Sequence, residues 1–139
     1  MFSHFLVAVD GSDHSFRAVE EAARLTSSAN GSRITLLFVV APDSRGTSLL
    51  QFERITSIQK ERAERIGRHE ALLSERNVPY QVVIREGEAG PVIVKYANEI
   101  KPDMLLIGSR GLNKMQEFVL GSVSHKVMKR AACPIMIVK

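Results

Sequence analysis

The 139-residue chain lacks the features that mark several specialised classes of protein. Its one cysteine, Cys133, cannot form an intrachain disulfide, and it gives no cluster of metal-binding thiols. We expect it to be a small buried or boundary residue. No apolar run approaches the length of about 20 residues that crosses a bilayer, and the start, MFSHFLVAVD, has neither a basic segment nor a small-residue cleavage site. These absences predict a cytoplasmic protein with no membrane partner.

The charge pattern does not favour nucleic-acid binding. The net charge is +4, but lysine and arginine are spread along the chain and interleaved with glutamate, as in QKERAERIGRHE. Such interleaving is typical of a solvated helix face rather than a basic stripe. With 45% hydrophobic and 24% charged residues, the composition is that of a globular protein, and the length predicts one domain over residues 1–139.

A glycine-rich segment, residues 108–124 (GSRGLNKMQEFVLGSVS), stands between an apolar run and a helix-like segment. Gly108, Gly111 and Gly121 give it a GxxGx9GS spacing. Glycine allows a backbone to approach an anion closely and to adopt positive φ angles, so the spacing favours a phosphate-binding loop. The alternative is that these glycines only turn the chain and cap a helix.

The hydrogen-bond donors of this loop would come from the start of the helix that follows it. The first N–H groups of a helix have no intrahelical partner, so we expect those of Ser122, Val123 and Ser124 to be available to a phosphate. The two serine hydroxyls could add two more donors. Arg110 could reach a phosphate or could simply face solvent, and Lys114 is a weaker candidate of the same kind.

Predicted strands and helices alternate strictly along the chain. The strands are expected at residues 5–9, 34–40, 80–85, 104–107 and 135–138. Alternation of this kind demands an α/β fold with a parallel sheet, helices on both faces and right-handed crossovers. The first and fourth strands are short and apolar without polar alternation, which places them side by side at the centre. The result is one doubly wound, Rossmann-like, five-stranded sheet with strand order 3-2-1-4-5.

Two segments between these strands have patterns of their own. Residues 41–50 lose all periodicity, which predicts a mobile loop. A long helix should follow, with one apolar stripe that we expect to lie in the core. The residues of the stripe are Phe52, Ile55, Ile58, Ala63, Ile66 and Leu73.

The strand order places Asp10, after the first strand, and Gly108, after the fourth, at the same crevice. A carboxylate beside a polyphosphate would be repelled, so Asp10 would serve the other end of a ligand by accepting hydrogen bonds from a ribose or a base. The alternative is that Asp10 only caps the first helix or orders the DGSD turn. Ala8 and Ile107 are expected to line the same pocket.

The glycine pattern, the closing GSVSHKVMKRAACPIMIVK and the opening FLVAVDGSDHS closely resemble the universal stress protein family, and specifically its nucleotide-binding branch. The resemblance covers essentially the whole chain. It implies ATP as the ligand, with AMP or ADP as related ligands, and leaves open whether Mg²⁺ accompanies the nucleotide. It also implies that Asp10 contacts the nucleoside and that the backbone of Val39 meets the adenine. A regulatory role in the stress response and a homodimer paired through the last strand are further implications.

The sequence itself supports the dimer. The last strand, residues 135–138, is apolar and lies at the edge of the predicted sheet, with only Lys139 to protect it. An apolar edge with unpaired backbone groups is a template for pairing with another chain. We therefore expect the homodimer to form through the C-terminal strand.

The sequence offers little that would support catalysis. It contains neither a GxxxxGKS nor a GxxxxGKT loop, so no lysine is placed for β- and γ-phosphates, and it lacks an SGGxDS-type pyrophosphatase loop. There is also no evident general base. We expect nucleotide binding with little or no turnover, at most a weak ATPase. The alternatives are a slow ATP hydrolase or nucleotidyl-transfer enzyme, and a structural or interaction protein whose loop is empty.

Overall fold

The computed structural model describes residues 2–27, 31–42, 51–110 and 120–139. Within these ranges the chain forms one five-stranded sheet with order β3-β2-β1-β4-β5, and the neighbouring strands pair in parallel. The elements are β1 (His4–Val9), α1 (Asp13–Ser27), β2 (Arg33–Val40), α2 (Gln51–Glu75), β3 (Tyr80–Glu86), α3 (Ala89–Ile100), β4 (Met104–Gly108), α4 (Ser122–Arg130) and β5 (Ile135–Val138). The predicted fold class and strand order are confirmed.

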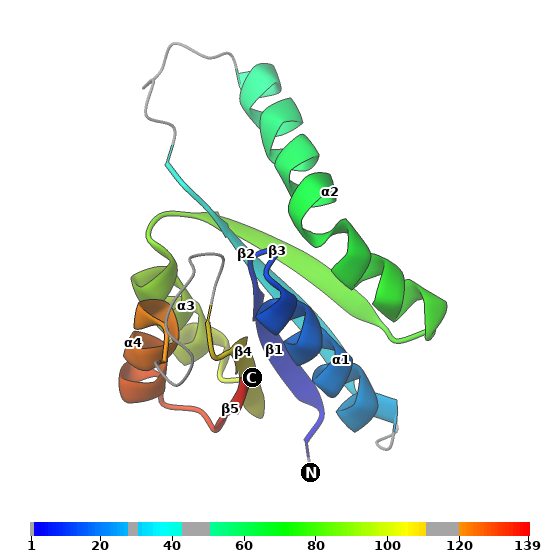
Figure 1. Ribbon diagram of the computed structural model, residues 1–139, viewed down its shortest axis with the longest axis vertical. Coiled ribbons are helices and arrows are strands. Elements are labelled where there is room, and N and C mark those ends of the chain that lie inside the picture. The colour runs from blue at the N-terminus through cyan, green and yellow to red at the C-terminus, as the bar shows by residue number, and fades with distance from the viewer. Residues whose placement is uncertain (1, 28–30, 43–50, 111–119) are drawn as a thin grey trace.

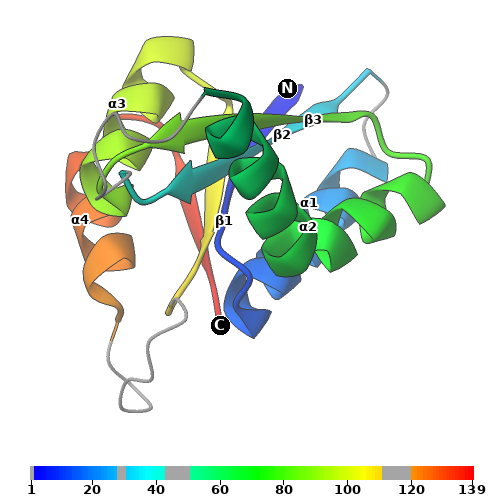
Figure 2. The same cartoon turned by 90° about the horizontal axis from the view of Figure 1, so that it is seen from above.

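The helices cover both faces of the sheet. Helices α1 and α2 lie on one face, and α3 and α4 lie on the other (Figures 1 and 2). In the described ranges, no helix combines the length and the apolar character that crossing a membrane requires. The predicted loop at residues 41–50 lies, from residue 43 onward, outside the described residues.

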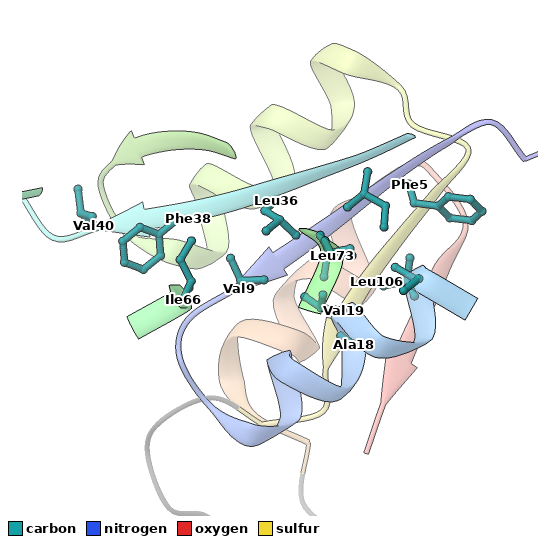
Figure 3. Close-up of a cluster of buried hydrophobic side chains, with 14 residues drawn as sticks. Phe5, Val9, Ala18, Val19, Leu36, Phe38, Val40, Ile66, Leu73 and Leu106 are labelled. Atoms are coloured by element: carbon teal, nitrogen blue, oxygen red, sulfur yellow. The ribbon is translucent and has the colours of Figure 1, made fainter. Parts of the chain in front are cut away.

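Two hydrophobic cores result from the alternation of side chains along the central strands. Phe5, Val7 and Val9 of β1 belong to the core under α1 and α2, which Figure 3 shows in close-up. Leu6 and Ala8 belong to the second core, which includes residues of α3 and α4. Because successive side chains of a strand point to opposite faces, a continuously apolar strand is buried on both sides. This explains why β1 is at the centre of the sheet.

The turn between β1 and α1 is fixed by two residues. Ser12 caps the helix, since its Oγ accepts a hydrogen bond from the Ser15 N–H at 3.1 Å. Gly11 has a φ of +88°, and a Cβ added there would lie 3.1 Å from the backbone oxygen of Arg65 in α2. A left-handed φ and a close neighbouring helix both demand glycine. The turn thereby places Asp10 at the carboxyl edge of the sheet.

The expectation that the apolar stripe of α2 is entirely buried is wrong for its first half. Phe52 and Ile55 are 76% and 52% exposed and Ala63 is also exposed, whereas Ile66 and Leu73 are fully buried. The reason is length: 25 residues of helix extend about 37 Å, whereas the seven-residue strand β3 extends about 23 Å. The first turns of α2 therefore project beyond the sheet (Figure 1).

Candidate functional site

A cavity of about 530 Å³ opens at the carboxyl ends of β1, β2 and β4. Asp10 and Gly108 both line it, as the predicted strand order requires. It is lined by Ala8, Val9, Asp10, Ser15, Leu37, Val39, Ala41, Ala89, Ile93, Ile107, Gly108, Arg110, Gly121, Ser122, Val123 and Ser124. The candidate site residues named from the sequence are therefore brought together, except Gly111 and Lys114, which lie outside the described residues.

One end of the cavity is formed by the start of α4. The first helical hydrogen bond runs from the His125 N–H to the Gly121 carbonyl at 2.9 Å. The N–H groups of Ser122, Val123 and Ser124 precede it, and helix geometry leaves such groups without an intrahelical partner. They also carry the positive end of the helix dipole, so this end of the cavity suits an anion.

Two hydrogen bonds join the start of α4 to the end of β4. The Gly121 N–H donates to the Ser109 carbonyl at 2.8 Å, and the Ser124 Oγ donates to the Gly108 carbonyl at 2.6 Å. The hydroxyl proton of the buried Ser124 is thus engaged, so this residue offers an anion its backbone N–H rather than its side chain. Ser122 is exposed and lines the cavity.

Neither described glycine of the motif has an unusual backbone conformation, and Gly108 instead serves close packing. A Cβ added at Gly108 would lie 2.7 Å from the Cβ of His14 and 2.8 Å from its carbonyl carbon. Gly108 therefore allows α1 to lie directly against β4. Gly121 has φ −61° and ψ 154°, an extended conformation open to any residue. Neither glycine supplies the positive φ that the spacing suggested.

Most of the remaining lining residues are apolar. Leu37 and Val39 of β2 and Ile107 of β4 contribute from the sheet, and Ala89 and Ile93 contribute from α3. An apolar wall with a few polar groups at one end is the usual composition of a small-molecule site. The arrangement can hold a molecule with an apolar, ring-like part and an anionic part.

Asp10 orders the turn that follows β1 and also lines the cavity. Its Oδ1 accepts hydrogen bonds from the Ser12 N–H at 2.9 Å and from the Ser12 Oγ at 2.5 Å, so it orders the DGSD turn. The same residue also lines the cavity. A carboxylate held by a turn in this way is a fixed acceptor that a ligand can approach.

Ser15, which sequence reasoning missed, lines the cavity and contacts a buried histidine. Its Oγ donates to the Ser12 carbonyl at 3.0 Å and lies 2.9 Å from His69 Nε2. Because the hydroxyl proton goes to Ser12, His69 must donate from Nε2, which leaves Nδ1 as a lone pair without a hydrogen-bond partner in the described part of the chain. Burial, followed by the charge of Arg68, lowers the pKa of His69 to about 4.

No three histidine, cysteine, aspartate or glutamate side chains of the described residues are grouped so that they could hold a metal ion. Cys133 is half-buried beside the second core, and burial raises the pKa of its thiol. The expectation that Cys133 is a boundary residue is confirmed.

These features define an α/β protein with an anion-suited helix start and an apolar wall at the carboxyl edge of a parallel sheet. The model of the universal stress protein family matches residues 1–139, and the chain belongs to this family. A universal stress protein of Thermus aquaticus is 33% identical over 141 residues, which cover all of both chains.

Solved structures agree with this assignment. The structure of the hypothetical protein MJ0577 superposes on this one with a TM-score of 0.82 at 23% sequence identity. The match covers 100% of this chain and 96% of the MJ0577 chain. A universal stress protein in complex with cAMP has a TM-score of 0.69 at 25% identity, with 99% of this chain and 96% of that chain covered. The fold is therefore that of the family throughout.

Proposed function

We propose that this protein binds an adenine nucleotide, with ATP as its main ligand, in the cavity at the carboxyl edge of the sheet. The observation that carries the proposal is that one cavity joins an apolar wall to the start of α4. The wall suits the adenine, and the N–H groups of residues 122–124 suit the phosphates. The cAMP complex of a universal stress protein at 25% identity supports an adenine nucleotide as the ligand class.

The size and the polar groups of the cavity fit such a ligand. Its volume of about 530 Å³ lies within the usual range of roughly 300 to 1,000 Å³ for small-molecule sites. In the proposed arrangement the backbone of Val39 meets the adenine, Asp10 accepts hydrogen bonds from the ribose, and Arg110 reaches the phosphates. Mg²⁺ would arrive with ATP, bound to its phosphates.

We further propose that the protein acts as a nucleotide-dependent regulator in the stress response. In this proposal the binding of the nucleotide, rather than its hydrolysis, produces the regulatory effect. Among the described lining residues, the charged side chains are Asp10 and Arg110. The guanidinium cannot accept a proton, and the Asp10 Oδ1 already accepts two hydrogen bonds from Ser12. In the proposed arrangement the remaining acceptor capacity of Asp10 serves the ribose, so neither group is assigned the role of a general base that activates water.

A homodimer paired through β5 completes the proposal. The strand is apolar and half-buried, and it forms one edge of the sheet. The carbonyls of Pro134 and Val138 accept hydrogen bonds from Leu105 and Ser109, so these residues face β4. Alternation along the strand then directs the backbone groups of Ile135 and Ile137 toward the open edge. Those groups are available for pairing with a second copy.

The test of nucleotide binding is a calorimetric titration with ATP, AMP and adenosine, with and without Mg²⁺. Gly121→Val places a branched side chain in the buried wall of the cavity, and we expect it to weaken ATP binding at least about tenfold by steric exclusion. Gly67→Val is the matched control, because a Cβ at Gly67 meets nothing within 4 Å and Gly67 does not line the cavity. ATP affinity that is equal in the two folded variants would contradict the phosphate assignment.

A further inference from the structure

Arg110 is held by a side chain that lies outside the cavity wall. His14, in the first turn of α1, has its Nε2 at 3.1 Å from the Arg110 Nη2 and its Nδ1 at 3.3 Å from the Ser109 Oγ. Since arginine can only donate, Nε2 must be the unprotonated nitrogen, and Nδ1 carries the proton that is directed at Ser109. The contact with Arg110 therefore selects one tautomer of a neutral imidazole.

The backbones on both sides of this contact are fixed. Gly108 lets the backbone of α1 at His14 lie directly against β4, as the 2.7 Å distance from a hypothetical Cβ shows. Ser109 is held twice, because its N–H donates to the Val138 carbonyl at 2.7 Å and its carbonyl accepts from Gly121 at 2.8 Å. The imidazole is thus a rigid acceptor, whereas the arginine side chain has several rotatable bonds whose freedom opposes binding.

The surroundings of His14 keep its Nε2 unprotonated and therefore able to accept a hydrogen bond from Arg110. Burial and then the positive charges of Arg17 and Arg110 lower the pKa of His14, and the carboxylate of Asp13 and a hydrogen bond to the Val138 backbone oppose them. The imidazole is therefore neutral near pH 7, which is the form that the geometry requires. A protonated ring could not accept from the guanidinium.

We propose that His14 is a positioning residue, whose imidazole orients the Arg110 guanidinium toward the phosphate of a ligand in the cavity. This inference rests on the proposed nucleotide binding. It adds to that proposal a residue outside the cavity lining, which acts only through Arg110. Its contribution should therefore be confined to ligands that carry a phosphate.

The test uses His14→Ala and His14→Gln, measured by titration with ATP and with adenosine. We expect His14→Ala to weaken ATP binding about fivefold, the effect of losing one hydrogen bond, and to leave adenosine binding unchanged. His14→Gln should restore most of the ATP affinity, because its amide oxygen can accept from Arg110. In an Arg110→Ala background, adding His14→Ala should have no further effect on ATP binding. Thermal melts establish that each variant is folded.

Three results would overturn the inference: unchanged ATP affinity in His14→Ala, an equal loss of ATP and adenosine affinity, or the same fivefold loss in the Arg110→Ala background. The second would identify His14 as a purely structural residue. If the unaltered protein binds ATP but the His14 effects are missing, only this inference fails. If the unaltered protein binds no adenine nucleotide, the proposed function fails and this inference fails with it.

Discussion

The buried imidazole of His69 links the cavity to the stability of the whole fold. It lies under α1, 2.9 Å from the Ser15 Oγ and edge-on to the ring of Phe16 at a centroid distance of 5.3 Å. A protonated imidazole at this position would bury a charge, which is why burial is the largest cause of its lowered pKa. Protonation would add its proton at Nδ1, which has no hydrogen-bond partner in the described part of the chain, and would leave the Nε2 hydrogen bond to Ser15 in place. The fold therefore depends on a neutral His69.

This dependence predicts a loss of stability in mild acid. Between the unfolded pKa of 6.5 and the folded pKa of about 4, the unfolded chain binds more protons at His69 than the folded chain does. The stabilisation is therefore complete above pH 6.5 and is lost as the pH falls toward 4, by about 3 kcal/mol at most. His4 and His14, whose pKa values are also lowered, act in the same direction.

Urea denaturation at a series of pH values from 7.5 to 4.5 measures this effect. We expect His69→Gln to have a shallower dependence of unfolding free energy on pH than the unaltered protein, whatever its stability at pH 7. Identical slopes for the two proteins would show that His69 is not the buried titrating group.

At the level of whole elements, helix α2 is divided between a packed half and a projecting half. Ile66 is fully buried in the core, and Ile55 is 52% exposed. The projecting half is tied to the sheet by Arg54, whose Nη2 contacts Glu86 at 2.8 Å and the Ala41 carbonyl at 2.9 Å. The ion pair is at the surface, so its contribution to stability is small.

The same substitution in the two halves should therefore have different effects. Ile66→Ala should lower the free energy of unfolding by about 2 to 4 kcal/mol, because it leaves a cavity in the core. Ile55→Ala should change it by less than about 0.5 kcal/mol. Denaturant unfolding of both variants measures the difference, and equal losses would mean that the first turns of α2 are buried in solution.

Strand β5 forms one edge of the sheet, and the proposed dimer depends on the backbone groups along that edge. Ile137→Pro removes an N–H that is directed at the open edge and leaves the groups that pair with β4 in place. We expect this variant to dissociate into monomers at concentrations where Ile137→Val, which keeps the N–H, remains a dimer. Sedimentation velocity over a dilution series distinguishes them. A sedimentation profile that is the same for Ile137→Pro and the unaltered protein would mean that the dimer interface lies elsewhere.

For the molecule as a whole, strand order and the location of the cavity were predictable from the sequence. The apolar runs at residues 5–9 and 104–107 indicate strands buried on both faces, and such strands occupy the centre of a doubly wound sheet. Once these strands are central, the residues that follow them, Asp10 and Gly108, necessarily meet at one edge. The pattern of apolar residues along the chain is therefore sufficient to predict that Asp10 and Gly108 lie at one crevice.

The contacts that refine the site were not predictable in the same way. His69 meets Ser15 across 54 positions, and His14 meets Arg110 across 96, so no local pattern marks either pair. The periodicity of α2 identifies its apolar face but not the length of sheet available to cover it. Similarly, the spacing of the glycines does not reveal that Gly108 accommodates α1. Each of these features depends on how separate elements pack together.

The cavity of this protein is proposed to bind an adenine nucleotide with little or no turnover. The most direct measurement is to denature the protein as purified from cells, without added nucleotide, and to identify and quantify the released small molecules by mass spectrometry. We expect a near-stoichiometric adenine nucleotide, chiefly ATP. Release of no adenine nucleotide, together with no binding when the purified protein is titrated with millimolar ATP, would contradict the claim.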